Sequence, residues 1–321
     1  MLSLDRATKI YKTGTFGGKD LVAVRDVSFD LKPGDVTSLI GESGSGKTTV
    51  GKMILKLIDI SHGSISLDGQ DVSSIHGPAV KSYYRHVQGV FQDPFSSYNP
   101  IFKADRVFSM IRSEYFANVP ASEWTGRLET ALRGVSLEPS QVLNKYPHQL
   151  SGGQLQRLLV ARALLLDLKV LVADEIISML DASTRIDVLN MLADLTKRGL
   201  GILFITHDLS LGNYISERTV ILRRGVVVEM GSTQKVFAHP THPYTRLLVA
   251  SVPQLHKKWA QIEEELGSPL GGEDGCPFHD AYPNAGRGAV RPASEPTLVE
   301  VEDDHFVGCF ELDGEKAQKV A

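Results

Sequence analysis

Cysteine is scarce in this sequence, with two residues in a chain of 321. Two thiols cannot form the disulfide framework of a small secreted protein, so we expect a protein of a reducing compartment. A basic excess is also missing, because 34 Lys and Arg residues stand against 38 Asp and Glu residues, a formal net charge of -4. This balance argues against a general nucleic-acid binder and against a polybasic membrane-surface protein.

Long apolar runs are missing as well. The most apolar region, 158–173, is interrupted by Arg162, Asp167 and Lys169, whereas a membrane-spanning helix needs about 20 apolar residues in succession. The amino-terminal sequence MLSLDRATKIYK also lacks the pattern of an export signal. We therefore expect a cytosolic chain that reaches a membrane only through another polypeptide.

The sequence does contain a regular alternation of short apolar runs and helical patterns between residues 2 and about 237, which is typical of an α/β domain. Helical spacing recurs at 155–166 and 186–193. The segment 93–150 has no strong strand pattern, and we interpret it as a helical insertion. The predicted strands, most of them continuous apolar runs expected of strands covered on both faces, are 36–40, 87–91, 170–173, 202–205 and 219–222.

The character of the sequence changes after about residue 239. Gly- and Pro-rich stretches such as GSPLGGEDG and PNAGRGAVRPASEP appear, after a charged helical pattern around 261–266. A chain of this length that is 42% hydrophobic can bury a full core and leave room for a smaller second region. We predict a main domain of residues 1–238, with a helical subdomain at about 93–160, and a loop-rich appendage of residues 239–321.

A phosphate-binding pattern, G-x-x-x-x-G-K-[ST], is met by GESGSGKT at 41–48, between a predicted strand and a helix predicted to start near Lys47. Its glycines let successive backbone amides face phosphate oxygens, and the helix terminus adds partial positive charge. A tight turn without a ligand is the alternative, and the Lys-Thr pair and the preceding strand argue against it. The predicted nucleotide-binding residues are Gly41, Ser43, Gly44, Ser45, Gly46, Lys47, Thr48 and Thr49, with Thr48 also a Mg²⁺ ligand.

A second site feature is VLVADE at 170–175, a buried-strand pattern that ends in two carboxylates. Acids at the carboxyl end of a parallel strand face the crevice where α/β folds bind ligands. We expect Asp174 to hold Mg²⁺ and Glu175 to polarise the attacking water. An ordinary solvated acidic pair is the alternative, and the phosphate-binding pattern upstream argues against it.

A third feature is LSGGQLQR at 150–157. Ser151, Gly152 and Gly153 are expected to open a helix with exposed backbone amides, as the 41–48 segment does, and Gln154 belongs to the same predicted site. One triphosphate does not need two such anion-binding sites from one chain.

The order GESGSGKT, FQDP, LSGGQLQR, VADE, SMLD and ITHD resembles that of the ABC ATPase family over most of the first ~240 residues, more than one typical domain. The resemblance implies a P-loop ATPase of α/β fold with a helical signature subdomain. It also implies hydrolysis of MgATP and a partner: in this family two ATPase subunits sandwich two ATP molecules, the signature helix of one subunit closing on the nucleotide held by the other.

The resemblance also implies individual roles. Gln92 looks like the residue that senses Mg²⁺ or the attacking water, and His207 like the residue that contacts the terminal phosphate. Asp181 looks like the aspartate that crosses the subunit interface, and Tyr11 like the aromatic residue that stacks on adenine. Two alternatives stay open: His207 as a neighbour of a helix-capping Asp208, and Tyr11 as a structural tyrosine.

One departure from the family pattern follows the catalytic glutamate. The family usually has Pro-Thr-Ser-Ala-Leu-Asp there, and this chain has Ile176, Ile177, Ser178, Met179, Leu180 and Asp181. Loss of the proline and the added bulk bear on how tightly this loop couples two ATP sites.

The tail resembles a narrower group. HPTHPYTRLLVASVP, GCPFH and HFVGC are similar to the carboxyl-terminal region of ATP-binding subunits from oligopeptide and dipeptide permeases, a branch that imports peptides, nickel or oligosaccharides. The resemblance implies a second, commonly non-identical ATPase subunit, two transmembrane permease subunits and an extracytoplasmic solute-binding protein, with no nucleic acid. It places the chain on the cytoplasmic face of the cell membrane as a peripheral protein.

Many relatives carry four cysteines here that resemble an iron–sulfur ligand set, whereas this chain has Cys276 and Cys309, and Tyr282 lies near an expected cysteine. Zinc is an alternative, because Cys276-x-x-His279 and His305-x-x-x-Cys309 have ligand-like spacing. We expect a packed, metal-free appendage.

Functions outside import were also weighed. An ABC protein of DNA repair or translation predicts coiled-coil arms or a second ATPase cassette, and neither pattern is seen. A regulatory subunit with weak ATPase predicts a damaged site, whereas Lys47, Asp174, Glu175 and His207 are all in place. An exporter half usually carries a fused membrane span, and no apolar run in this sequence is long enough to form one.

Overall fold

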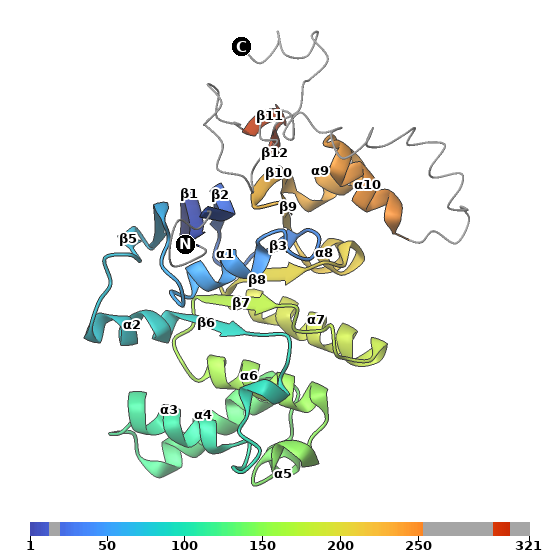
Figure 1. The fold of residues 1–321 in the computed structure, drawn as a ribbon. Helices are drawn as coiled ribbons and strands as arrows, with labels where there is room; N and C mark the ends of the chain where they lie inside the picture. Colours follow the sequence, from blue (N-terminus) through green and yellow to red (C-terminus); the bar gives the residue numbers. More distant parts are fainter. Residues whose placement is uncertain (13–19, 253–297, 309–321) are drawn as a thin grey trace, which may run out of the picture. The chain divides into compact units, whose positions relative to one another are not determined.

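The computed structural model describes residues 1–12, 20–252 and 298–308 (Figure 1). It consists of two compact units, each assembled from distant parts of the sequence. Unit 1 holds Met1, Leu31–Val36 and Ser74–Phe204, and unit 2 holds Leu2–Asp30, Thr37–Ser73 and the described residues from Ile205 on. The division into a domain of residues 1–238 and an appendage stays a prediction.

Unit 2 contains an antiparallel sheet of strand order β2-β1-β4-β5. Leu2 pairs with Leu67 and Leu4 with Ile65, and these four side chains are buried. The register shifts between Asp5 and Thr8, so the alternation of inward and outward residues is interrupted there. The strands are β1 (Leu2–Lys12), β2 (Asp20–Leu31), β4 (His62–Leu67) and β5 (Gln70–Asp71).

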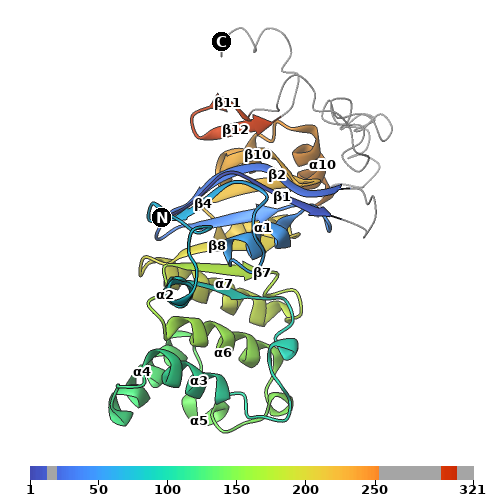
Figure 2. The same ribbon diagram turned by 60° about the vertical axis from the view of Figure 1, so that its left-hand side comes forward.

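A second set of strands in unit 2 has the order β11-β12-β10-β9-β3. β3 and β9 are parallel, with Leu39 opposite Val220, whereas β10 is antiparallel to both β9 and β12. Figure 2 shows the β11–β12 hairpin beside β10. The strands are β3 (Val36–Ile40), β9 (Arg218–Arg223), β10 (Val226–Ser232), β11 (Leu298–Glu302) and β12 (His305–Gly308).

The helices of unit 2 pack against these strands. One buried cluster joins Ile40 of β3, Ile221 of β9 and Val228 of β10 to Val236 of α9 and Tyr244 of α10. The helices are α1 (Lys47–Ile54), α8 (Leu209–Ile215), α9 (Thr233–Ala238) and α10 (Pro243–Ser251).

Unit 1 combines parallel strands with a group of helices. β6 (Val87–Val90) and β7 (Val170–Asp174) pair in parallel, with Val90 opposite Ala173, and β8 (Gly201–Thr206) follows in the order β8-β7-β6. Figures 1 and 2 show α3, α4, α5 and α6 grouped together. The helices are α2 (Pro78–His86), η1 (Phe95–Ser97), α3 (Arg106–Tyr115), α4 (Ala121–Gly134), α5 (Pro139–Val142), η2 (Pro147–Gln149), α6 (Gly152–Leu164) and α7 (Ala182–Thr196).

The predicted α/β architecture is confirmed. Strand 36–40 is found with its predicted bounds, α1 begins at the predicted Lys47, and the segment 93–150 contains helices and no strand. The predicted helix at 155–166 ends earlier, since α6 stops at Leu164. The helical pattern around 261–266 lies outside the described residues, among which no helix has the length and apolar character needed to cross a membrane.

Candidate functional site

The predicted phosphate-binding loop lies in unit 2 between β3 and α1. All five β3 residues are buried, which fixes the start of the loop. Gly44 and Gly46 have φ angles of 81° and 104°, a left-handed backbone that other residues rarely adopt. Gly46 caps α1 without a side-chain hydrogen bond. The first amides of α1 therefore face outward from a helix terminus, which is the arrangement that binds anions.

Close backbone contacts explain Gly41 and add a second reason for Gly46. A Cβ atom at Gly41 would lie 2.1 Å from the carbonyl oxygen of Leu222, and one at Gly46 would lie 2.7 Å from that of Ala23. Both distances are far below normal contact, so a side chain at either position would displace the loop. The amide of Gly225 also donates to the Ser45 carbonyl at 2.8 Å. The loop is thus fixed from outside by the β9–β10 connection.

Lys47 lies on the inner side of this loop and is 5% exposed. Its ammonium donates to the carbonyl oxygens of Gly41 at 2.8 Å and Glu42 at 2.7 Å. The Ser45 hydroxyl is buried and, among the described residues, has no hydrogen-bond partner. Since buried polar groups normally have a partner, this hydroxyl fits a bound phosphate oxygen.

Asp174 is the last residue of the fully buried strand β7 in unit 1 and is 6% exposed, and Glu175 directly follows it. Glu175 has a φ of 50°, a strained conformation for a residue with a side chain, of the kind that gathers at functional sites. Ser178 donates to the Glu175 carbonyl twice, from its amide at 3.1 Å and its hydroxyl at 2.9 Å. These bonds stabilise the turn that directs the Glu175 side chain.

Ser151 caps helix α6 in unit 1. Its hydroxyl accepts from the Gln154 amide at 3.2 Å, while the Gln154 side chain accepts from the Ser151 amide at 2.9 Å. The structure thus gives both side chains a capping role that the sequence interpretation did not include. A Cβ at Gly153 would lie 2.6 Å from the Thr184 methyl group, so Gly153 also permits α6 to approach α7. Ser151 itself is exposed.

Asp181 caps helix α7. It accepts from the Ser183 hydroxyl at 2.6 Å, the Thr184 amide at 3.0 Å and the Thr184 hydroxyl at 2.8 Å. These bonds, that of Ser183 most of all, hold the pKa of Asp181 well below its usual range. Among the departures from the family pattern, Ile176 and Ile177 are buried, whereas Met179 is 60% exposed.

His207 is exposed at the junction of β8 and α8. The adjacent Asp208 caps α8, accepting from the amides of Ser210 and Leu211. The helix cap by Asp208, on which the alternative interpretation of His207 depends, is therefore present. Gln92 is exposed shortly after β6.

Tyr11 is half-buried near the end of β1, with the Lys9 ammonium 5.2 Å from its ring centroid. The predicted residues thus fall into two groups. Unit 2 contains Tyr11, the 41–49 segment and His207, and unit 1 contains Gln92, residues 151–154, Asp174, Glu175 and Asp181.

Sequence reasoning missed the environment of His305, which it considered as a zinc ligand. One ring nitrogen lies 2.7 Å from Glu229 and the other 3.0 Å from Glu302, and the bond with Glu229 raises the pKa of His305. Both nitrogens are therefore engaged by carboxylates. Cys276, His279, Tyr282 and Cys309 lie outside the described residues. Within the described part, no group of three or more His, Cys, Asp or Glu residues could hold a metal ion.

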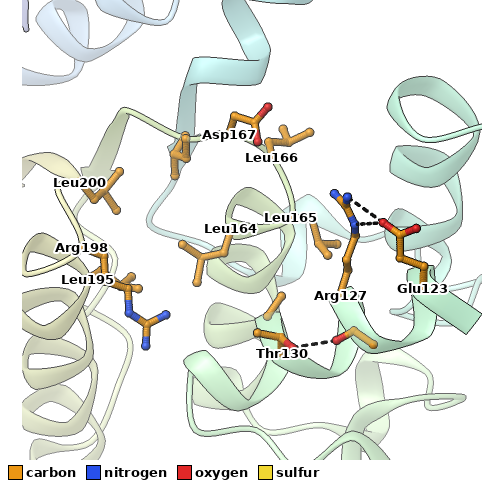
Figure 3. Close-up of a pocket in the computed structure, with 13 residues that line it drawn as sticks. Glu123, Arg127, Thr130, Leu164, Leu165, Leu166, Asp167, Leu195, Arg198 and Leu200 are labelled. Atoms are coloured by element: carbon orange, nitrogen blue, oxygen red, sulfur yellow. Dashed lines mark hydrogen bonds and ion pairs between the residues drawn. The ribbon is translucent and has the colours of Figure 1, made fainter. Parts of the chain in front are cut away.

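A cavity of about 960 Å³ lies within unit 1 (Figure 3). Leu164, Leu165 and Leu195 line it, together with Arg127, which pairs with Glu123 at 2.9 Å. None of the predicted nucleotide-site residues lines it.

Comparison with known proteins agrees with the geometry of the loop. Residues 24–178 match the sequence model of the family described as ABC transporter. A solved dimeric ATP-binding cassette, MJ0796 in a post-hydrolysis state with ADP and Pi, is 28% identical and superimposes with a TM-score of 0.64, covering 73% of this chain and 99% of that one. The chain belongs to the ATP-binding proteins of ABC transporters and is an ATPase of that class.

The branch within this family is also shown. Residues 228–286 match the oligopeptide/dipeptide transporter C-terminal region. A protein of Brucella ovis, provisionally named as a peptide import ATP-binding protein, is 37% identical over 97% of both chains. The oligopeptide transport ATP-binding protein OppF of Haemophilus influenzae is 33% identical, over 91% of this chain and 89% of its own length. The glutathione import ATP-binding protein GsiA of Pectobacterium atrosepticum is 37% identical over 91% of this chain and 45% of its own length.

Proposed function

We propose that this chain hydrolyses MgATP to drive uptake of a peptide-like or related solute, such as a dipeptide, oligopeptide, oligosaccharide or nickel, through partner membrane subunits. The observation that carries the proposal is the similarity to the provisionally named peptide import protein, which extends over 97% of both chains. The match of residues 228–286 to the oligopeptide/dipeptide transporter C-terminal region supports the same branch. An ABC protein of DNA repair or translation has no such support.

The proposed chemistry assigns one task to each group. Amides of residues 43–49 and the Lys47 ammonium bind and orient the phosphates, and Tyr11 stacks on adenine. Glu175 accepts a proton from the attacking water, while Gln92 and His207 position the water and the terminal phosphate. Positioning and charge stabilisation supply most of the catalysis in phosphoryl transfer.

The residues proposed for Mg²⁺ suit that ion. Thr48, Gln92 and Asp174 offer hydroxyl, amide and carboxylate oxygens, the hard ligands that Mg²⁺ prefers, and Thr48 is exposed at the start of α1. When bound, the ion would neutralise charge on the outer phosphates.

The proposed assembly contains a second, non-identical ATPase subunit, two transmembrane permease subunits and an extracytoplasmic solute-binding protein. The dimeric state of the MJ0796 cassette supports pairing of ATPase subunits. Residues 151–154 and Asp181 would then act on the nucleotide of the partner subunit. We place the chain on the cytoplasmic face of the membrane as a peripheral protein.

The decisive experiment reconstitutes this chain with its partner ATPase and membrane subunits in proteoliposomes and measures ATP hydrolysis. Solute-binding protein loaded with a peptide should stimulate hydrolysis and drive accumulation of the peptide inside vesicles of the correct orientation. Empty binding protein is the control. ATP hydrolysis that no solute-loaded binding protein stimulates would contradict the import function while leaving the ATPase assignment intact.

A further inference from the structure

The carboxyl-terminal region contacts the phosphate-binding loop directly. The backbone amide of Glu42, the second residue of GESGSGKT, donates to the hydroxyl of Tyr244 at 3.1 Å. Tyr244 lies on α10, and its position falls within the 228–286 segment that matches the oligopeptide/dipeptide transporter C-terminal region. Both residues belong to unit 2.

Both polar backbone groups of Glu42 form hydrogen bonds. Its amide is bound by Tyr244, and its carbonyl oxygen accepts from the Lys47 ammonium at 2.7 Å. The loop residue that anchors the phosphate-binding lysine is therefore itself anchored by Tyr244. A hydrogen-bond partner that fixes the loop before nucleotide arrives lowers the ordering cost of binding.

Tyr244 is rigidly placed. It is 1% exposed, packs in one cluster with Ile40, the residue that precedes the loop, and lies with its ring centroid 4.8 Å from the Arg223 guanidinium. Burial raises the pKa of its hydroxyl to about 12, so the group stays a neutral phenol at neutral pH. Because the side chain is already fixed, accepting the hydrogen bond from Glu42 costs Tyr244 little further conformational entropy.

A buried carboxylate fixes the start of α10. Glu229, 0% exposed on β10, accepts from the amides of Thr241 at 2.8 Å and His242 at 2.9 Å, and lies 2.7 Å from His305 of β12. His242 in turn accepts from the Tyr244 amide at 3.0 Å. Glu229 and His242 thus define where Tyr244 lies.

We infer that Tyr244 is a positioning residue for ATP binding, through which the carboxyl-terminal region preorganises the phosphate loop. This inference rests on the ATPase function. Its role belongs to the nucleotide-free loop, because bound phosphates fix the same backbone once ATP is present. Loss of the hydroxyl should therefore raise KM for ATP and leave kcat at saturating ATP nearly unchanged.

The test is Tyr244→Phe, which keeps the buried ring and removes the hydroxyl. In the reconstituted assembly we expect KM for ATP to rise about fivefold and kcat to stay within about twofold, from the usual contribution of one hydrogen bond. Tyr83→Phe is the matched control, because Tyr83 is an equally buried tyrosine (3% exposed) on α2 of unit 1. It should leave KM unchanged.

A double-mutant cycle isolates the contact. Glu42→Pro removes the donated N–H, so Tyr244→Phe should not raise KM further in that background. Amide hydrogen exchange of the full nucleotide-free chain provides a second measurement: Tyr244→Phe should speed exchange at Glu42 about fivefold. A KM within twofold of the parent, or an equal rise in both backgrounds, would overturn the inference. A parent assembly without ATPase activity would instead contradict the proposed function.

Discussion

Glu175 has a strained backbone, with a φ of 50°, and its carbonyl oxygen accepts two hydrogen bonds from Ser178. If its carboxylate is the general base, Glu175→Gln keeps the shape of the side chain and removes the proton acceptor. We expect ATP affinity within about twofold of the parent and turnover reduced by at least about 100-fold. The variant should accumulate as an ATP-bound dimer with its partner ATPase, measured by size-exclusion chromatography with MgATP.

The control for this substitution is Glu129→Gln on α4, which removes a carboxylate paired with Arg133. It should keep the turnover and elution profile of the parent. Hydrolysis by Glu175→Gln at the parental rate would show that another group accepts the proton.

Lys47 contributes at an earlier step, because its buried ammonium lies within the phosphate loop. Lys47→Ala removes this cation and its bonds to the Gly41 and Glu42 carbonyls. From the usual value of hydrogen bonds to charged groups, we expect ATP affinity to fall by about 10- to 150-fold, measured by isothermal titration. Lys52→Ala, an exposed lysine on the same helix, should bind ATP like the parent. Equal affinities for both variants would remove Lys47 from the site.

At the scale of the element, helix α6 tests the proposed subunit interface. Ser151→Arg places a bulky side chain at the exposed amino terminus of α6, where the partner's nucleotide is proposed to lie. We expect ATP binding by the chain itself to be preserved, while dimer closure in MgATP and stimulated turnover are lost. Size-exclusion chromatography and ATPase assays distinguish these effects.

The capping role of Ser151 calls for a matched variant, since arginine at this position removes the bond from the Gln154 amide. Ser151→Ala loses the same cap, at a cost of about 1 kcal/mol, without added bulk. It should lower the melting temperature as Ser151→Arg does and still close on ATP. Closure and turnover by Ser151→Arg at parental levels would contradict the shared-interface arrangement.

Elements differed in how far the sequence predicted them. Strand β3 has five buried residues in succession, so its apolar run has a single reasonable interpretation and its bounds were predicted correctly. β1 was not predicted, because its register shifts between Asp5 and Thr8 and Arg6 has a φ of 45°, which breaks the period of two. The β11–β12 hairpin was also missed, and its place beside β10 depends on pairing that no local pattern encodes.

The residues of the candidate site also differ in how far the sequence predicts them. Gly44 of the phosphate loop has a local reason, its left-handed backbone, whereas Gly41 is also required by its close approach to the distant Leu222 carbonyl. The contact of Tyr244 with Glu42 joins residues 202 positions apart in the sequence, and no local sequence pattern predicts it. Individual roles of the predicted site residues stay predictions until the variants above are measured.

For the molecule as a whole, two buried histidines give opposite dependences of stability on pH. Burial lowers the pKa of His242 to about 4, with Glu229 opposing this and Arg223 and Arg246 adding to it. Between pH 4 and about 6.5 the unfolded chain therefore binds a proton that the folded chain does not, so stability falls as pH decreases. His305, bonded to Glu229 and Glu302, has a raised pKa, and its stabilisation is complete below about pH 6.5 and is lost as pH rises through the folded-state pKa.

These two histidines together should give a stability maximum near pH 6.5. Melting temperatures of the full chain between pH 4.5 and 8.5 would show it. His305→Gln should flatten the alkaline side alone, and His242→Asn the acidic side alone. Unchanged slopes on both sides in both variants would show that other groups set the pH dependence.

The long sequence separation of Glu42 and Tyr244 has a consequence during synthesis. At about 5 to 20 residues per second, a ribosome needs about 10 to 40 s to go from one residue to the other. For that interval the nascent chain carries a complete phosphate-loop sequence without its anchor. If Tyr244 positions the phosphate loop as inferred, a growing chain gains this contribution to ATP affinity only after residue 244 has been added.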